Sequence, residues 1–269
     1  MQSLPINYLI ALRASIEAAE KIMEIYTIGF EAEYKADGSP VTRADLASSE
    51  IIENYLRKTG IPITGEESAQ QPYHERKLWE ELWCVDPLDG TKEFVKRNGE
   101  FCVNIAFIRQ KRPVFGIIAS PTSRRLIFGG LETGVFECSF EDLEHAVMWE
   151  KINGKTQQNT PVVMVGSRSH HSGIDLKFID DLKAMHGDVD FIKLGSALKF
   201  FHLVRGEADV YPRFAPTMEW DIAAGQALLE GVGGKVMHAE RNEPLHYNKE
   251  DLTNPSFVAQ SCVLSKESQ

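Results

Sequence analysis

Two carboxylates, Asp86 and Asp89, stand in one short segment that directly follows an apolar run. Pro87 fixes φ and Gly90 permits a positive φ, so we expect the backbone to turn sharply there. Such a turn can direct both carboxylates and a main-chain carbonyl to one point, and hard oxygen ligands of this kind suit Mg²⁺, Mn²⁺ or Ca²⁺. Gly90 and Thr91 then offer N–H groups and a hydroxyl to an anion such as phosphate. The segment predicts metal-dependent phosphatase chemistry.

Three further acidic residues occur where a metal site could use them. Glu66 follows the apolar segment 61–63, and Asp221 lies at the start of a predicted helix. Asp45 falls in the first turn of another predicted helix, where the positive end of the helix dipole favours a carboxylate. Each residue alone is typical of a solvated surface or a helix cap. Their combination in this order favours one shared site.

Length and charge limit the classes of partner. The chain has 269 residues, of which 43% are hydrophobic and 25% charged, as is usual for one large or two modest globular domains. Its formal net charge of −10 argues against a nucleic acid polymer, because backbone binding needs a basic surface. A small polyanion remains compatible if divalent cations and a few local Lys or Arg residues neutralise it.

The location is predicted from what the sequence lacks. No early stretch has the order of a signal peptide, and no run of about 18 apolar residues suggests a membrane span. The four cysteines are widely spaced and predict reduced, structural thiols: Cys84, Cys102, Cys138 and Cys262. We expect a cytoplasmic protein. Peripheral attachment to the cytoplasmic face of the inner membrane, and a homodimer, are compatible with the sequence.

Two helices are predicted before the acidic turn. The first should bury one face that carries Leu12, Ile16, Ala19 and Met23, which follow helical spacing. The second should begin at Thr42 as its cap and end near Gly60 and Pro62. Its apolar face comprises Ile51, Ile52, Tyr55 and Leu56.

The rest of the chain predicts two kinds of sheet. After the acidic turn, β-rich runs at 101–108, 114–119, 125–128 and 134–136 predict an antiparallel sheet. Beyond a polar stretch at 153–159, strands (162–166, 191–194, 209–211, 235–238) alternate with helices (175–185, 197–205, 222–229) and predict an α/β layer. We therefore expect an N-terminal α+β subdomain (1–155) with the metal site and a C-terminal α/β subdomain (156–269) with nucleotide contacts.

Six segments carry a resemblance to a known family. They are 89–94 (Asp-Gly-Thr-Lys-Glu-Phe), 96–101 (Lys-Arg-Asn-Gly-Glu-Phe), 167–170 (Ser-Arg-Ser-His), 195–200 (Gly-Ser-Ala-Leu-Lys-Phe), 211–214 (Tyr-Pro-Arg-Phe) and 220–225 (Trp-Asp-Ile-Ala-Ala-Gly). From about residue 35 to 250 the sequence resembles the Mg²⁺-dependent, lithium-sensitive phosphatase superfamily of inositol monophosphatases and fructose bisphosphatases. It is most similar to the 3′(2′),5′-bisphosphate nucleotidase (CysQ-type) branch, because Lys92 and Glu93 stand where inositol-directed members usually carry Thr-Asn.

The resemblance implies a layered αβαβα fold of the inositol monophosphatase type, in the α+β or α/β class. It implies hydrolysis of the 3′-phosphate of adenosine 3′,5′-bisphosphate to AMP and phosphate, and action on the sulfated form of this nucleotide. The implied metal ligands are Glu66, Asp86, Asp89, Asp221 and the Leu88 carbonyl, and the implied water-activating pair is Asp45 and Thr91. Two or three Mg²⁺ ions would bind, with Mn²⁺ as a substitute and Ca²⁺ and Li⁺ as inhibitors.

Substrate contacts are predicted from residue chemistry and from the matching segments. Arg213 can bond a phosphate with two N–H groups, and Lys199 can supply a point charge. The remaining predicted contacts follow strands or lie in the matching segments: Gly90, Thr91, Ser167, His170, Ser196 and Tyr211. The alternative for Lys199 and Arg213 is a solvated surface charge, and for a loop histidine it is plain polar surface.

Two other functions compete with the nucleotidase hypothesis. An inositol monophosphatase or sugar bisphosphatase would use the same acidic core, although Lys92 and Glu93 disfavour it. A non-catalytic nucleotide-binding protein would be expected to lose a ligand carboxylate or Thr91, and none is lost. Gly65 and Ala197 depart from the serines that some relatives carry, but they lie beside the motifs and affect only fine substrate contacts.

Overall fold

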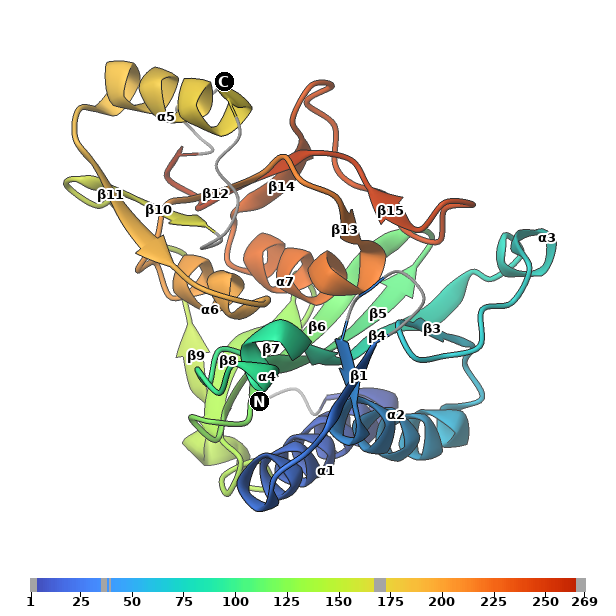
Figure 1. The fold of residues 1–269 in the computed structure, drawn as a ribbon. Helices are drawn as coiled ribbons and strands as arrows, with labels where there is room; N and C mark the ends of the chain where they lie inside the picture. The colour runs from blue at the N-terminus through green and yellow to red at the C-terminus, as the bar shows by residue number, and fades with distance from the viewer. Residues whose placement is uncertain (1–3, 35–37, 39, 167–172, 265–269) are drawn as a thin grey trace.

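The computed structural model describes residues 4–34, 38, 40–166 and 173–264. Its outer layers are α1 (Ile6–Ile28) with α2 (Arg43–Leu56) on one face and α5 (Gly173–His186) on the other (Figure 1). Between them lie a seven-stranded sheet, the helices α6 (Leu198–Val204) and α7 (Glu219–Gly231), and a five-stranded sheet. The predicted αβαβα layering is confirmed.

The predicted cap of α2 is confirmed. The Thr42 hydroxyl accepts a hydrogen bond from Ala44 N at 3.1 Å, and Thr42 N donates to the Asp45 carboxylate at 2.7 Å. These bonds satisfy N–H groups that the first turn of a helix leaves without partners. Asp45 is thereby held in a defined rotamer at the start of α2. The helix ends in the short η1 (Arg57–Thr59), which Gly60 terminates in a left-handed conformation.

The buried faces of α1 and α2 differ in part from their prediction. Leu12 and Ala19 are fully buried, as are Ile52 and Leu56. The other members of the predicted faces, Ile16, Met23, Ile51 and Tyr55, are only partly buried. The reason is that α1 is covered by both α2 and the sheet, so its buried stripe is wider and centred on small residues such as Ala11, Ala14 and Ala18.

The seven-stranded sheet carries most of the acidic site. Its order is β3 (Ile63–Gly65), β4 (Glu81–Asp89), β5 (Cys102–Arg109), β6 (Arg112–Ser120), β7 (Arg125–Gly130), β8 (Gly134–Ser139) and β9 (Glu150–Ile152). β3 and β4 are parallel, and the other neighbours are antiparallel. The predicted antiparallel sheet after the acidic turn is confirmed.

The prediction of a sharp turn at Asp86 is wrong. β4 does not stop at Asp86 but continues to Asp89, with Asp86 opposite Asn104 and Asp89 opposite Cys102. Two residues of β4 therefore face one residue of β5 at this point, which makes a β-bulge rather than a turn. Pro87 has no N–H to pair and is tolerated in such an irregularity. The bulge keeps both aspartates on one strand.

The five-stranded sheet is mixed rather than a pure α/β layer. Its order is β11 (Val189–Lys193), β10 (Val162–Gly166), β12 (Val210–Arg213), β16 (Phe257–Gln260) and β14 (Lys235–His238). The first three strands are parallel, and β16 runs antiparallel to both of its neighbours. β16 lies between β12 and β14, and it comes from a segment in which no strand was predicted.

The other missed elements are short. They are β1 (Ala32–Tyr34), β2 (Pro40–Thr42), η1, α3 (Tyr73–Arg76), α4 (Thr91–Val95), η2 (Ala146–Met148), β9, β13 (Thr217–Met218) and β15 (Thr253–Asn254). The β13–β15 pair joins residues about 36 positions apart, so no local pattern can reveal it. A helical or strand pattern of apolar residues can be recognised only over several residues, so elements this short do not show one.

The two predicted subdomains share a core. The large sheet ends at Ile152 and the second sheet begins at Val162. One hydrophobic cluster nevertheless joins strands of the large sheet to α6, α7 and the second sheet, while another packs the opposite face against α1 and α2. The division at 155/156 remains a prediction. Within the described ranges, no helix combines the length and apolar character needed to cross a membrane.

Candidate active site

Four carboxylates from three distant segments converge beside the β4 bulge. Asp86 and Asp89 lie on β4, Glu66 directly follows β3, and Asp221 lies in the first turn of α7. A Cβ on Gly65 would come within 2.3 Å of Val85 O, so only glycine permits β3 to run this close to β4. Glu66 N then donates to Val85 O at 3.2 Å, which fixes Glu66 next to Asp86.

The pKa values of Asp86 and Asp221 are raised in part by the charges of the neighbouring carboxylates. Burial raises the pKa of Asp86 well above its usual range, and the charges of Glu66, Asp89 and Asp221 raise it further. Burial, followed by the charge of Asp89, raises the pKa of Asp221 to about 8. Buried carboxylates that repel one another are stable as anions only with a cation among them.

Each aspartate of the cluster accepts a hydrogen bond on one oxygen, from a backbone N–H group or from the Asn104 amide. Asp86 Oδ1 accepts from Leu88 N at 3.0 Å, Asp221 Oδ2 from Met218 N at 2.8 Å, and Asp89 Oδ2 from Asn104 Nδ2 at 3.0 Å. No described residue donates a hydrogen bond to the second oxygen of these three carboxylates. Each side chain is thus oriented by one oxygen while the other remains open to a ligand.

The donor set fits Mg²⁺ by its chemistry. Among the described residues, no three His, Cys, Asp or Glu side chains are already arranged around a single ion. Mg²⁺ does not require such a cage, because it usually keeps several waters and binds through one or two carboxylates and substrate phosphate. Hard, oriented carboxylate oxygens with mutual repulsion match that requirement. The individual ligand roles remain proposals.

Asp45 and Thr91 form a hydrogen-bonded pair at the edge of this cluster. Thr91 Oγ1 donates to Asp45 Oδ1 at 2.9 Å, with Leu88 O as a second acceptor at 3.2 Å. Asp45 is buried, and burial raises its pKa in spite of the bonds from Thr42 and Thr91. Because the hydroxyl proton points to Asp45, the Thr91 oxygen can accept a hydrogen bond from water.

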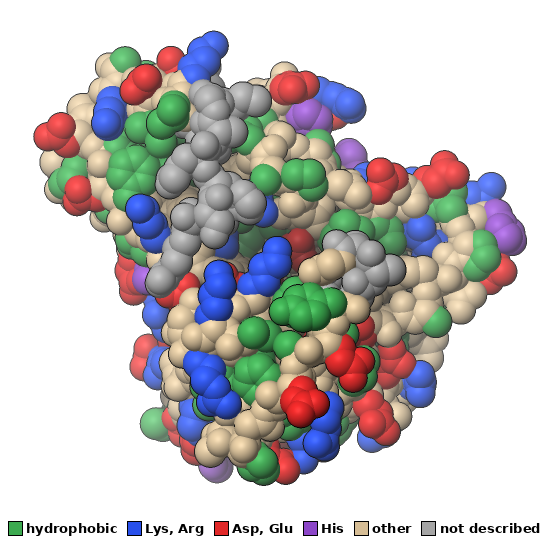
Figure 2. All heavy atoms as spheres, in the orientation of Figure 1, with side chains coloured by type: hydrophobic (Ala, Val, Ile, Leu, Met, Phe, Trp, Pro, Cys, Tyr) green, Lys and Arg blue, Asp and Glu red, His purple; other side chains and the backbone are tan. Residues whose placement is uncertain are grey.

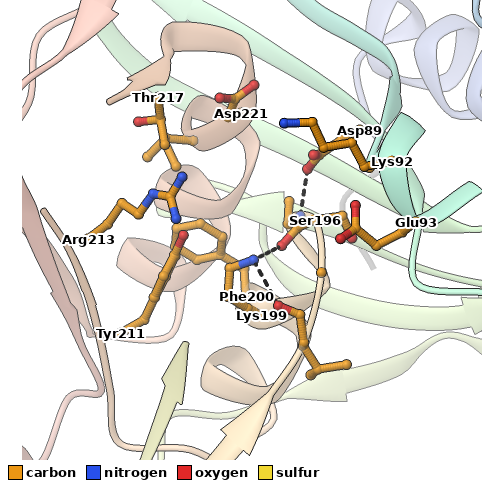
Figure 3. Close-up of a pocket in the computed structure, with 15 residues that line it drawn as sticks. Asp89, Lys92, Glu93, Ser196, Lys199, Phe200, Tyr211, Arg213, Thr217 and Asp221 are labelled. Atoms are coloured by element: carbon orange, nitrogen blue, oxygen red, sulfur yellow. Dashed lines mark hydrogen bonds between the residues drawn. The ribbon is translucent and has the colours of Figure 1, made fainter. Parts of the chain in front are cut away.

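A cavity of about 270 Å³ opens beside the carboxylates. Its lining brings together seven of the predicted site residues: Asp89, Gly90, Ser196, Lys199, Tyr211, Arg213 and Asp221. Figure 3 shows Arg213, Tyr211 and Lys199 on one side of the cavity and Asp89, Lys92 and Glu93 on the other. Figure 2 shows Lys and Arg side chains beside the central hollow of this face. Ser167 and His170 lie outside the described residues.

Lys199 is not a solvated surface charge. Its side chain is buried, and Nζ donates to Ser196 O at 2.5 Å and Leu194 O at 3.3 Å. Burial lowers its pKa, an effect that the charge of Asp89 opposes. The surface alternative is therefore wrong for Lys199, which holds the loop that contains Ser196 in place from below. Arg213 is partly buried and directed into the cavity (Figure 3).

The Ser196 loop is fastened to the acidic site. Ala197 N donates to Asp89 Oδ2 at 2.5 Å, and Gly195 N donates to Glu100 at 2.9 Å. Ser196 has φ 48°, a left-handed conformation that costs a residue with a Cβ some strain. The hydrogen bonds of its neighbours maintain that conformation. Asp89 therefore connects the carboxylate cluster to the Ser196 loop.

Comparison with known proteins decides the family. The sequence-family model described as the inositol monophosphatase family matches residues 7–268, which is nearly the whole chain. The chain belongs to the inositol monophosphatase family. This is a family of Mg²⁺-dependent phosphatases, so the carboxylate cluster has the chemistry that the family requires.

Individual relatives agree with this membership. The chain is 36% identical over 247 residues to the 3′(2′),5′-bisphosphate nucleotidase CysQ of Shigella flexneri, which covers 89% of this chain and 94% of that protein. CysQ of Escherichia coli strain K12 is also 36% identical, over 245 residues. The crystal structure of CysQ from Bacteroides thetaiotaomicron has TM-score 0.85 and 42% identity, covering 95% of this chain and 97% of that one. An IMPase of Thermotoga maritima, with TM-score 0.74 and 20% identity, supports the fold. The predicted family and fold are confirmed.

Several residues of this inositol monophosphatase site were missed by sequence reasoning. Asn104 is fully buried and bonds Asp89, and Glu100 holds Gly195. Lys92, Glu93 and Thr217 line the cavity. Asn104 offered a signal, since an amide in the middle of an apolar strand needs a polar partner. Glu100 and Thr217 offered none, because their partners lie far away in sequence.

Mg²⁺ should stabilise the folded protein more at high pH than at low pH. A carboxyl whose folded pKa is raised binds more protons when folded than unfolded, so without metal its contribution to stability falls as pH rises from about 4 toward the folded value. For Asp221 that value is about 8. We expect the Mg²⁺-induced rise in Tm, measured against an EDTA control, to grow between about pH 5 and about pH 9. An equal rise at both ends would contradict the carboxylate cluster as the binding site.

Proposed function

We propose that this chain is a 3′(2′),5′-bisphosphate nucleotidase that hydrolyses the 3′-phosphate of adenosine 3′,5′-bisphosphate to AMP and phosphate. It acts on the sulfated form of the nucleotide at the same phosphate. The observation that carries the proposal is one cavity lined both by carboxylates, Asp89 and Asp221, and by the cations Lys199 and Arg213. One phosphate can lie at the acidic side with its metal, and a second phosphate at the basic side. The relatives named CysQ support this reading.

Metal is proposed at the acidic side. Its ligands are Glu66, Asp86, Asp89, Asp221 and the Leu88 carbonyl, and they hold two or three Mg²⁺ ions. Bound Mg²⁺ would supply charge stabilisation on the phosphate and a lower pKa for the attacking water. Mn²⁺ should substitute, since it accepts the same oxygen ligands. Ca²⁺ is larger and prefers more ligands, so we expect it to inhibit, as we expect of Li⁺.

The water-activating step belongs to Thr91 and Asp45. The Thr91 hydroxyl donates to Asp45 at 2.9 Å, so its oxygen accepts a proton of the attacking water and orients the water toward phosphorus. As the water loses that proton, Thr91 passes its own proton to Asp45. Burial raises the pKa of Asp45 and therefore favours its acceptance of the proton. The hydrogen bond along which Thr91 passes its proton is already formed in the structure.

Substrate orientation is proposed for the rest of the cavity. Arg213 can form two parallel hydrogen bonds to a phosphate. The N–H groups of Gly90 and Thr91 face the transferred phosphate. Lys199 adds positive charge while it supports the Ser196 loop, and Tyr211 lies beside Lys199 with 5.4 Å between Nζ and its ring centroid.

The remaining expectations concern Ser167, His170 and the setting of the enzyme. Ser167 and His170 are proposed as further nucleotide contacts. The protein is proposed to work in the cytoplasm, with peripheral attachment to the inner membrane compatible, on a small nucleotide rather than a nucleic acid polymer. A homodimer is compatible with the proposal.

Phosphate release with Mg²⁺ should be fastest on adenosine 3′,5′-bisphosphate. We expect a kcat/KM at least about tenfold higher than for inositol 1-phosphate, which has no second phosphate for the basic side of the cavity. The same advantage is expected over fructose 1,6-bisphosphate, which has two phosphates but no nucleoside to hold them in the same arrangement. The three substrates should be compared side by side in one malachite-green assay. A preference for inositol 1-phosphate or fructose 1,6-bisphosphate would replace the nucleotidase with a sugar or inositol phosphatase. Binding of nucleotide without release of phosphate would indicate a non-catalytic protein.

A further inference from the structure

The first residue of α7 is a fully buried carboxylate that the proposed mechanism does not use. Glu219 has 0% exposure and lies two positions before Asp221. Its carboxylate accepts hydrogen bonds from Asn248 N at 2.6 Å and Lys249 N at 3.0 Å, and it pairs with Lys249 Nζ at 2.6 Å. The start of α7 is thereby fastened to the segment around residue 249.

The same segment fixes the residue that orients Asp221. β15 pairs with β13, and Asn254 Nδ2 donates to Met218 O at 2.7 Å. Met218 N in turn donates to Asp221 Oδ2 at 2.8 Å. Glu219 N also donates to Leu252 O at 3.0 Å. The carboxylate of Asp221 therefore follows the position of the 248–254 segment.

Arg76 connects this segment to α3. It is buried in α3, in the connection between Glu66 and Asp86. Arg76 Nη1 donates to Asn248 Oδ1 at 2.7 Å, and Asn248 Nδ2 donates back to Arg76 O at 2.7 Å. Figure 1 shows α3 and β15 on the same side of the molecule.

We name Arg76, Glu219, Asn248 and Lys249 the α7 brace. None of the four lines the substrate cavity. Burying a charged pair costs desolvation energy that apolar packing would avoid, so such a network is a poor device for stability alone. It is a good device for position, because fully satisfied polar networks permit only one arrangement.

We propose that the α7 brace positions Asp221 relative to Glu66 and so sets the affinity for Mg²⁺. This inference rests on the proposed function, because it takes Asp221 and Glu66 as metal ligands. Mg²⁺ needs near-ideal octahedral geometry, so a small displacement of one carboxylate weakens binding. The brace residues are positioning residues and touch neither substrate nor metal.

The test replaces Lys249 by methionine, which keeps length and removes the charge. We expect Lys249→Met to raise the Mg²⁺ concentration for half-maximal rate about tenfold, the effect typical of residues that support metal ligands. kcat at saturating Mg²⁺ should remain unchanged. Calorimetric titration of the substrate-free protein with Mg²⁺ should show the same loss of affinity. The Lys249→Arg variant, which keeps the positive charge, should bind Mg²⁺ with nearly the wild-type affinity.

The chain offers a matched control in Lys155. Its Nζ pairs with Asp209 at 2.7 Å, and Asp209 is likewise fully buried and accepts backbone N–H groups, from Asn159 and Val163. Asp209 belongs to no part of the acidic site. Lys155→Met should therefore lower Tm while leaving Mg²⁺ affinity unchanged.

The outcomes distinguish a failure of the positioning role from a failure of the proposed function. If Lys249→Met and Lys155→Met change Mg²⁺ affinity equally, or neither changes it, the brace has no positioning role. If Lys249→Met does not fold, Asn254→Ser is the second variant, because it removes the bond to Met218 O together with the longer contacts to Thr217 Oγ1 and Lys249 Nζ. It should show a smaller increase in Mg²⁺ requirement, and unaltered affinity would overturn the proposal. If wild-type protein neither binds Mg²⁺ nor releases phosphate, the proposed function itself fails.

Discussion

Replacing Asp86 by asparagine removes the phosphatase activity and leaves the protein folded. Asp86 is 1% exposed, and Asn keeps an oxygen that can accept the bond from Leu88 N. What is lost is the anionic oxygen at the centre of the cluster. Metal ions contribute several kcal/mol to transition-state stabilisation, and each step of about 1.4 kcal/mol is tenfold in rate, so the loss should be at least about 10³-fold.

Without metal, Asp86→Asn should be at least as stable as wild type. The charges of Glu66, Asp89 and Asp221 all raise the pKa of Asp86, so removing its charge relieves repulsion. The comparison is thermal melting in EDTA together with an assay over a range of Mg²⁺ concentrations. Asp209→Asn is the matched control, since it removes another fully buried aspartate that has an ion pair. Asp209→Asn should be less stable than wild type but should keep its phosphatase activity. Substantial turnover by Asp86→Asn would refute the metal assignment.

Replacing Thr91 by alanine lowers kcat by about 10²- to 10⁴-fold, the range that general acid–base assistance contributes. The Asp45 carboxylate remains held by Thr42, but the hydroxyl that links it to water is gone. The Mg²⁺ requirement should stay the same, because Thr91 supplies no metal ligand. Stopped-flow or steady-state phosphate release at several Mg²⁺ concentrations measures both quantities.

Serine at position 91 provides the control for this prediction. Thr91→Ser keeps a hydroxyl within reach of Asp45 and should retain most of the rate. A change in Mg²⁺ affinity, rather than in kcat, would give Thr91 a different role. Thr91 Oγ1 also lies 3.2 Å from Leu88 O, so a loss of Mg²⁺ affinity in Thr91→Ala would show that the threonine acts by holding a ligand carbonyl.

Asp89 ties these two predictions to the substrate side of the site. Its Oδ2 accepts from Asn104 Nδ2 on β5 and from Ala197 N, so one carboxylate oxygen connects the large sheet to the Ser196 loop. Any displacement of Asp89 on metal binding is transmitted to that loop through a hydrogen bond of 2.5 Å. The carboxylate cluster and the Ser196 loop are therefore physically connected.

Local patterns predicted much of the fold. The cap of α2 at Thr42 and the β5–β6 hairpin follow from neighbouring residues, and both are present. The order of the acidic residues along the chain also identified the family that the comparisons confirm. These features depend on chemistry within a few positions of each residue, or on motif spacing.

Other features escaped because their causes lie far apart in sequence. β16 forms only because β12 and β14 offer it free edges, and the bulge in β4 appears only against β5. The burial of Lys199 depends on a loop that folds over it. Propensity contains no information about such partners.

The sequence alone determined which groups could do chemistry: hard carboxylate oxygens, a threonine beside an aspartate, and a few cations in an acidic chain. Only the tertiary structure decided that Glu66 and Asp221 lie close enough to raise the pKa of the buried Asp86 and that Lys199 supports a loop. The physical reason is that side-chain identity is local, whereas burial, pKa and orientation are set by neighbours that the chain reaches only after folding.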